Sequence, residues 1–209
     1  MEKENFRERE RKSRTETTEN KKIGFGKSVL LYLHDLSYLI AVMMVLFLLV
    51  FRVVIVSGSS MESTLIEGDY VLLLGSGLYS EPEPGDVVVA SKDSFDNGIP
   101  IVKRVIAVEG QTVRIDAGTN HVYVDGQLLT EPYIYNQPDY TYFEDIQVTV
   151  GKDQVFVMGD HRSVSCDSRS NRMGLLEERE IMGKAVFLFL PGQDPQTKER
   201  DFDRFGGLD

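Results

Sequence analysis

One stretch of the chain carries no charge and constrains the fold more than any other feature. Residues 36–51 read LSYLIAVMMVLFLLVF, and after Arg52 the apolar sequence continues through Val56. Sixteen helical residues span about 24 Å and twenty-one span about 31 Å, close to the thickness of a bilayer core. The run is apolar on every face, unlike a helix that packs on the surface of a soluble domain. The sequence therefore predicts a transmembrane anchor over residues 36–56.

Charge is divided unevenly on the two sides of this run. Residues 1–35 contain nine Lys or Arg against seven acidic residues, whereas residues 57–209 contain 13 basic and 26 acidic residues. Because cytoplasmic flanks carry the excess of Lys and Arg, we expect the N-terminus in the cytoplasm and a single pass through the plasma membrane. The predicted organisation is a basic cytoplasmic leader (1–35), the anchor (36–56), an extracytoplasmic domain (57–191) and a flexible, polar C-terminal tail (192–209).

Two other interpretations of the apolar run stay open. A cleaved signal peptide would need a small-residue cleavage site, which Ser57-Gly58 resembles, although a leader of some 35 residues is long for this class. A buried core helix fits less well, because a polar leader of disordered type precedes the run.

Composition excludes several classes of function. The net charge of −10 argues against a nucleic-acid partner, since phosphates are bound by clustered Lys and Arg. A single cysteine excludes an intramolecular disulfide framework and a Cys-rich zinc module. The three histidines, at positions 34, 121 and 161, lack the spacing of metal ligands, and we expect no metal or other cofactor.

The part after the anchor has the pattern of a β domain. Turn signals such as Asp125-Gly126 separate its short apolar runs, and Asp-Gly is typical of tight hairpins. We expect an antiparallel β-sandwich or barrel-like fold, with one brief helical candidate at Leu175–Glu180. The predicted strands are Asp69–Leu74, Asp86–Ala90, Ile101–Val108, Thr112–Ile115, His121–Val124, Ile146–Val150, Gln154–Met158 and Ala185–Leu190.

The predicted strand Ile101–Val108 contains two adjacent cations among apolar residues. Lys103 and Arg104 point to opposite faces of a strand, and both faces are otherwise apolar. Burial lowers the pKa of a lysine, whereas arginine stays charged, so Lys103 is the candidate base and Arg104 a candidate ion-pair or edge residue. A neutral lysine beside a serine forms a nucleophile–base pair without histidine.

Two polar segments could supply partners for this lysine. The serine-rich sequence SGSSMESTL follows the apolar run, and by itself it has the composition of a linker. The sequence MGDHRSVSCDSR begins at Met158, and by itself it is typical of a structural loop in which Asp160 and Asp167 pair with Arg162 or Arg169.

Taken in order, these segments resemble the bacterial type I signal peptidases, in the single-anchor form of Gram-positive bacteria. The likeness covers residues 30–191 and rests on SSMESTLIEGDYVLL, EPGDVVV, VKRVIAVEG, MGDHRSVSCDSR and GLLEEREIMGKAVFLFLP. The resemblance implies that Ser60 is the nucleophile and Lys103 the general base. It also implies that Ser165 orients the lysine, that Asp167 and Arg169 form an ion pair that shapes the loop, and that Gly159 and Asp160 are structural.

The resemblance further implies a membrane-anchored serine endopeptidase that removes signal peptides through an acyl-enzyme. Its expected partners are the lipid bilayer and exported pre-proteins with small residues at the cleavage site, with the secretion translocon left open as another. Two alternatives stay open, a peptidase dedicated to one exported substrate and a membrane-tethered β domain that binds without cutting. A self-cleaving repressor with a Ser-Lys pair is disfavoured, because a charge-free membrane run has no place in a soluble DNA-binding protein.

The chain departs from the family pattern at four positions. Ser63 stands where proline is usual, which would loosen the turn after the nucleophile. Gly58 lacks the hydroxyl that helps the oxyanion hole in some relatives, which leaves the backbone N–H of Ser60 as the main donor. His161 replaces the usual asparagine, and Leu190 replaces the usual tryptophan before Pro191. None of the four removes the predicted Ser-Lys pair.

Overall fold

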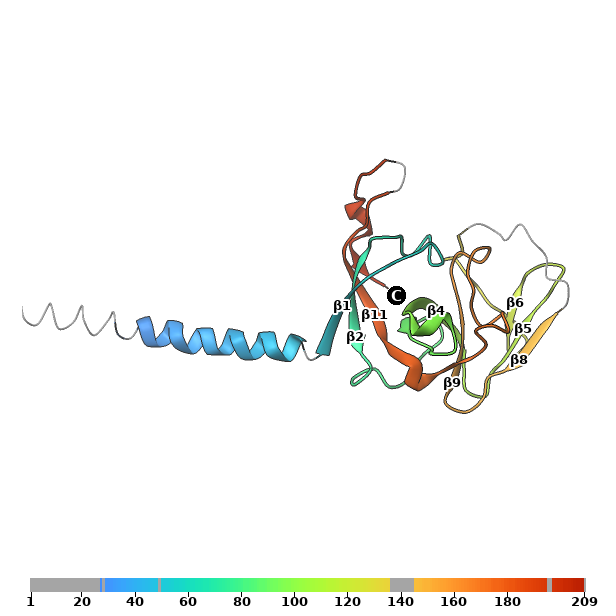
Figure 1. Cartoon of the computed structure of the whole chain (residues 1–209), viewed down its shortest axis with the longest axis horizontal. Helices are drawn as coiled ribbons and strands as arrows, with labels where there is room; N and C mark the ends of the chain where they lie inside the picture. Colours follow the sequence, from blue (N-terminus) through green and yellow to red (C-terminus); the bar gives the residue numbers. More distant parts are fainter. Residues whose placement is uncertain (1–26, 28, 49, 136–144, 195–196, 209) are drawn as a thin grey trace, which may run out of the picture. The chain divides into compact units, whose positions relative to one another are not determined.

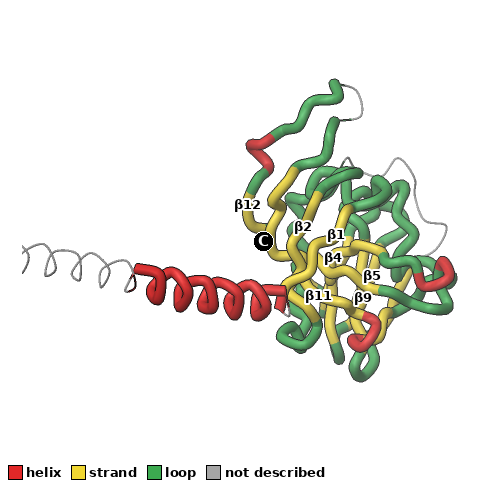
Figure 2. The backbone as a smooth tube through the Cα atoms, turned by 60° about the vertical axis from the view of Figure 1, so that its left-hand side comes forward, coloured by secondary structure: helices red, strands yellow, loops and turns green. Residues whose placement is uncertain are grey.

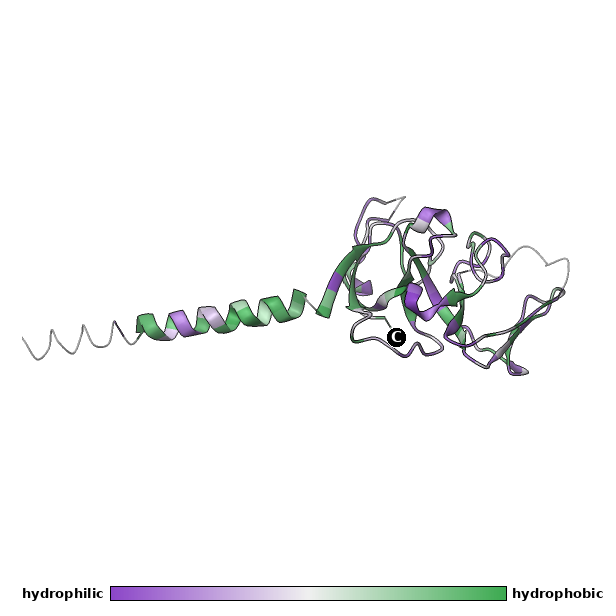
Figure 3. Ribbon diagram, turned by 60° about the horizontal axis from the view of Figure 1, so that its bottom comes forward, coloured by the Kyte–Doolittle hydropathy of each residue, from purple (hydrophilic) through white to green (hydrophobic). Residues whose placement is uncertain are grey.

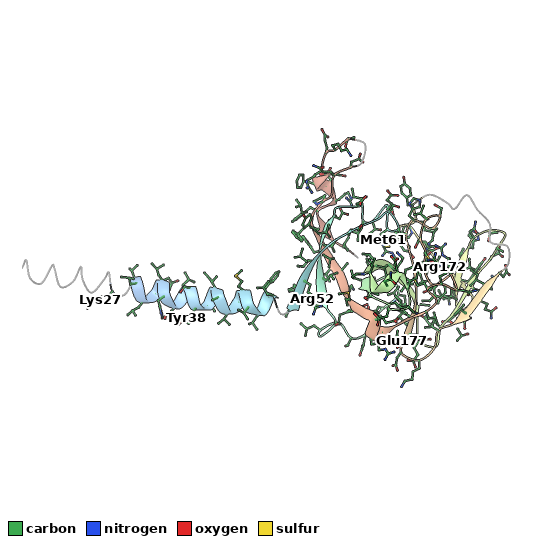
Figure 4. All side chains as sticks on the ribbon, in the orientation of Figure 1. Lys27, Tyr38, Arg52, Met61, Arg172 and Glu177 are labelled. Carbon is green, nitrogen blue, oxygen red and sulfur yellow. The ribbon has the colours of Figure 1, made fainter. Side chains whose placement is uncertain are left out.

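The structure is a computed structural model that describes residues 27, 29–48, 50–135, 145–194 and 197–208 (Figure 1). The chain divides into two units at residue 50, and each is described by itself. The first unit contains an apolar helix, Val29–Leu48, whose 20 residues are long and apolar enough to cross a membrane (Figure 3). Its side chains, Tyr38 among them, project from all sides of the helix (Figure 4). Most of the predicted leader, residues 1–26 and 28, lies outside the described residues.

The C-terminal part of the expected anchor differs from the prediction. Strand β1, Phe51–Ile55, occupies positions predicted to belong to the membrane helix, and it pairs antiparallel with β2, Tyr70–Gly75. The sequence VVIV is β-branched throughout, which favours a strand over a helix. Val54 and Val56 pack into the core while Val53 and Ile55 are exposed. The end of the apolar run is therefore a strand whose side chains alternate between the core and the surface.

The larger sheet of the second unit is antiparallel and curled, and it holds eight strands of the described chain. Beyond β1 and β2, its members are β3 (Val87–Ala90), β4 (Ile101–Val108), β9 (Gln154–Met158), β10 (Leu176–Glu177), β11 (Ile181–Leu190) and β12 (Gly206–Gly207). Their order is β1-β2-β11-β3-β4-β9-β10, and β12 pairs with β11 beyond the end of β3. Figure 2 labels β1, β2, β4, β9, β11 and β12 of this sheet.

The smaller sheet has the order β7-β6-β5-β8 among the described residues. Its strands are β5 (Thr112–Ile115), β6 (Val122–Val124), β7 (Gln127–Leu128) and β8 (Ile146–Thr149). The expected hairpin is present, with Asp125 and Gly126 both at positive φ between β6 and β7. A shared apolar cluster that includes Ile106 and Phe156 from the larger sheet and Val113 from the smaller joins the two sheets. The prediction of a mainly β antiparallel fold after an apolar helix is confirmed.

Two further segments differ from the prediction. The helical candidate Leu175–Glu180 is the short strand β10 followed by a single 3-10 turn, η2 (Glu178–Glu180). A flexible tail was expected over residues 192–209, but its described part contains secondary structure. The 3-10 turn η3 (Phe202–Arg204) precedes strand β12. The polar composition of this segment gives no sign of the two residues that attach it to the domain. Arg204 pairs with the buried Asp69, and Phe205 contacts Phe187 of β11. The remaining 3-10 turn is η1, Asp96–Gly98.

Candidate active site

Ser60 lies in a tight turn between β1 and β2. The neighbouring Met61 and Leu65 are 1% and 0% exposed and belong to the core of the larger sheet. Met61 is labelled in Figure 4. The backbone N–H of Leu65 donates to the Met61 carbonyl at 2.8 Å, which closes the turn. Gly58 precedes it at a positive φ of 89°, a conformation that glycine adopts without strain. Apolar anchors after Ser60 thus fix a half-buried serine at the rim of the sheet.

Lys103 comes from the middle of β4 and meets this serine. Its residue exposure is 4%, and its Nζ lies 2.7 Å from Ser60 Oγ and 2.8 Å from the Val102 carbonyl oxygen. Burial lowers the pKa of Lys103 to about 8, with Arg169 acting in the same direction and the negative charges of Asp167 and Asp160 opposing it. No carboxylate lies within ion-pair distance of the lysine among the residues that the structure describes. The lysine can therefore lose its proton near neutral pH while it touches the serine hydroxyl.

Arg104, the next residue of β4, has the opposite environment. Its guanidinium donates through Nε and Nη2 to the two oxygens of Asp160, at 2.9 and 2.7 Å, and both side chains are buried. Nη1 donates to the Gly85 carbonyl at 2.8 Å, and the ring of Tyr133 lies 4.0 Å from the guanidinium carbon. The prediction of Arg104 as an ion-pair residue is confirmed.

The loop after β9 carries the second buried ion pair. Arg169 donates from Nε and Nη2 to both oxygens of Asp167, each at 2.7 Å, and Asp167 is 1% exposed. The same carboxylate accepts the backbone N–H of Gly159 at 2.9 Å. The expected pair is thus present, and it ties the start of the loop to its end.

Gly159 packs directly against the candidate nucleophile. A Cβ at this position would lie 2.4 Å from the Ser60 carbonyl oxygen and 2.3 Å from Ser165 Oγ, so no larger side chain fits. Ser165 Oγ is buried and has no hydrogen-bond partner among the described residues. The geometry brings Ser165 next to the Ser60 turn, while its role in orienting Lys103 stays a prediction.

Sequence reasoning missed several residues that brace the same turn. Glu62 binds His161 Nδ1 at 2.7 Å, and the backbone N–H of His161 donates to the Ser60 carbonyl at 3.1 Å. Ser63 has a φ of 87°, which a proline ring forbids, and its hydroxyl donates to the Tyr133 carbonyl. The expected loosening at Ser63 is therefore replaced by a specific contact. Such contacts join segments far apart in the sequence, and no local signal indicates them.

The described residues contain no cluster of three or more His, Cys, Asp or Glu side chains arranged to hold a metal ion. The groups available for chemistry at this site are the Ser60 hydroxyl, the buried Lys103 amine and the backbone N–H groups of the turn. This set suits nucleophilic attack on a carbonyl.

Comparison with known proteins gives consistent matches. The profile of the family described as "Signal peptidase, peptidase S26" matches residues 30–190. The chain is 38% identical over 143 residues to the "Probable signal peptidase I-1" of Synechocystis, which covers 65% of this chain and 69% of that protein. It is 32% identical over 202 residues to "Signal peptidase I T" of Bacillus subtilis, with 90% and 98% covered. The crystal structure of a signal peptidase I from Enterococcus faecalis aligns with a TM-score of 0.42 and 25% identity, over 51% of this chain and 98% of that one.

Proposed function

The chain belongs to the signal peptidase family, peptidase S26, and from that premise we propose that Ser60 and Lys103 form the catalytic pair of this serine endopeptidase. Its reaction is the removal of N-terminal signal peptides from exported pre-proteins. The observation that carries the residue assignment is the 2.7 Å contact between Ser60 Oγ and a buried lysine with a lowered pKa.

The chemistry follows from the protonation state of the lysine. Neutral Lys103 takes the proton of Ser60 as Oγ attacks the scissile carbonyl carbon, and the resulting oxyanion is bound by the backbone N–H of Ser60. The C–N bond breaks, the leaving amine receives the proton from Lys103, and an acyl-enzyme remains. Water then gives a proton to the lysine and attacks the ester, which frees the second product and restores the serine hydroxyl. Asp167 and Arg169 hold the loop beneath the lysine in this scheme.

The sheet offers an edge on which an extended substrate can lie. Residues 101–103 of β4 pair with β3 on one side, whereas the pairing of β4 with β9 begins only at Arg104. Within the described residues the other edge of 101–103 is therefore unpaired, and it leads to Lys103. A substrate strand that adds here would bring its scissile bond to Ser60, with small side chains next to the site.

The apolar helix supports a membrane-anchored enzyme. We place the anchor at Val29–Leu48, the basic leader in the cytoplasm and the β domain outside, in a single pass of the plasma membrane. Because the substrate's signal peptide is held in the same bilayer, both meet at a raised effective concentration, and weak contacts at the sheet edge suffice.

The test is cleavage of a pre-protein by the detergent-solubilised full chain. Ser60→Ala and Lys103→Ala should each lower kcat by on the order of 10⁴-fold or more, because each removes one half of a concerted pair. Ser163→Ala and Lys152→Ala, at exposed positions, are the matched controls and should retain wild-type rates. Near-normal processing by either the Ser60 or the Lys103 variant would rule out the assignment.

A further inference from the structure

The described end of the chain forms a strap, defined here as residues Arg200–Leu208, which lies beyond the part matched by the family profile. The strap is attached to the larger sheet, where β12 pairs with Phe187 and Leu188 of β11 (Figure 2). The ring of Phe205 meets that of Phe187 edge to face at 5.0 Å, and Leu208 packs against the core cluster that contains Met61 and Leu65. The strap therefore approaches the same core that anchors the Ser60 turn.

A buried carboxylate depends on this strap for its counter-charge. Asp69 is 0% exposed and accepts the backbone N–H groups of Ile66 and Gly192 at 2.8 and 2.6 Å. Arg204 of the strap donates to both of its oxygens, at 3.0 and 2.6 Å. Among the described residues, Arg204 is the one cation within ion-pair distance of Asp69. A buried charge requires a partner of opposite sign, and here the partner comes from 135 residues further along the chain.

The same arginine also holds the turn that carries the nucleophile. Arg204 Nη2 donates to the carbonyl oxygen of Thr64 at 3.1 Å. The hydroxyl of Thr64 donates to Asp160 at 2.5 Å, and its backbone N–H donates to Met61 at 3.0 Å. Thr64 is thus fixed from both sides, by the strap through its carbonyl and by the Arg104–Asp160 pair through its side chain.

We propose that Arg204 is a positioning residue for catalysis: the strap holds Thr64 and Asp69 so that the turn presents Ser60 to Lys103. The inference rests on the proposed role of Ser60 as the nucleophile. Arg204 touches no reacting atom and acts only by fixing the turn. Because reaction rates depend steeply on the placement of reacting atoms, a small shift of Oγ from Nζ lowers kcat without altering the sheet edge that binds substrate.

The experiment compares two arginines of the same strap in the solubilised full chain. Arg204→Gln should lower kcat by on the order of 10-fold with KM within about 2-fold of wild type, when rates are taken per folded enzyme well below the melting temperature. Arg200→Gln is the matched control, because its guanidinium donates to the Pro191 carbonyl instead of Thr64, and it should keep the wild-type kcat. Arg204→Lys, which retains a charge without the planar fork, should recover part of the loss.

A second variant separates positioning from folding. If Arg204→Gln fails to fold because Asp69 is left unpaired, the double variant Asp69→Asn/Arg204→Gln removes the buried charge while leaving the Thr64 carbonyl unbound. We expect the double variant to fold and to show a kcat lower than that of the wild type by on the order of 10-fold, with an unchanged KM.

Three outcomes would overturn the proposal: a wild-type kcat per folded molecule in the double variant, an equal loss in Arg204→Gln and Arg200→Gln, or a loss that lies entirely in KM. Ser60→Ala assayed in parallel keeps the two hypotheses apart. Activity in Ser60→Ala removes the proposed nucleophile, whereas an inactive Ser60→Ala with a fully active Arg204→Gln removes only the role of the strap.

Discussion

Two neighbouring residues of β4 bury a cation by opposite means. Lys103 is 4% exposed and contacts a serine hydroxyl and a backbone carbonyl. Arg104 is 3% exposed, and its Nε and Nη2 both donate to the carboxylate of Asp160. Arginine cannot lose its proton in a protein, so its burial requires a carboxylate. Lysine can, and a site without a paired carboxylate favours its neutral form. One strand thus supplies a structural cation on one face and the proposed base on the other.

The comparison predicts that the same substitution has opposite effects on stability at the two positions. Arg104→Met should lower the free energy of unfolding by about 3–5 kcal/mol, because it leaves Asp160 buried without its partner. Urea denaturation of the solubilised chain measures this loss. Arg104→Met combined with Asp160→Asn should recover much of it, since the unpaired charge is then gone. A loss below about 1 kcal/mol in the single variant would show that Asp160 finds another partner.

Lys103→Met should instead raise the free energy of unfolding by about 1–3 kcal/mol at pH 7 while it abolishes cleavage. The folded-state pKa of Lys103, about 8, lies below its ordinary value of 10.5, so the unfolded chain binds more protons between these values. The lysine therefore costs most stability below pH 8, and the cost falls as pH rises toward 10.5. The gain from methionine should shrink over the same window in denaturation curves. A gain that does not depend on pH would contradict a buried, titrating lysine.

The pH dependence of cleavage tests the base directly. In the proposed mechanism neutral Lys103 is the reactive form, so kcat/KM should rise with pH toward a plateau with an apparent pKa near 8, by about tenfold per pH unit below it. The control is His161→Asn, since His161 contacts both Glu62 and the Ser60 backbone. A profile that this variant leaves in place supports Lys103, whereas a displaced acid limb would assign the titration to His161.

The local sequence was sufficient to predict a buried cation in β4 and the positions of eight strands. Adjacent cations in a strand that is apolar on both faces must include a buried one, and the eight predicted strands are all present. Hydropathy alone does not separate the anchor from β1, because an apolar run fits a helix and a strand equally well. The β-branched residues of VVIV are the local signal that favours the strand. Ion pairs such as Arg204–Asp69 depend on the fold, since no spacing rule links residues 135 positions apart.

The contacts that support the site differ in how far apart their partners lie in the sequence. Asp167–Arg169 lies within three residues and matches a motif, so it was predicted from the resemblance. Glu131–Arg162 and the Ser63–Tyr133 contact join the segment after β7 to the site loops, and nothing in their local sequence indicates a partner. The local sequence therefore indicates the proposed catalytic pair, whereas it does not indicate most of the contacts that support it.

The smallest expected effect concerns the aromatic ring on the guanidinium of Arg104. Tyr133 lies 4.0 Å from that buried cation, and Tyr123 lies 4.2 Å from Arg114, whose side chain is 39% exposed. Cation–π contacts contribute more when the cation is desolvated, so Tyr133→Leu should lower the free energy of unfolding by about 1–2 kcal/mol and Tyr123→Leu by about 0.5–1 kcal/mol. Urea denaturation of both variants at high salt removes most of any long-range charge effect from the comparison. Equal losses would mean that the ring at Tyr133 contributes area alone, and that Asp160 by itself stabilises the charge on Arg104.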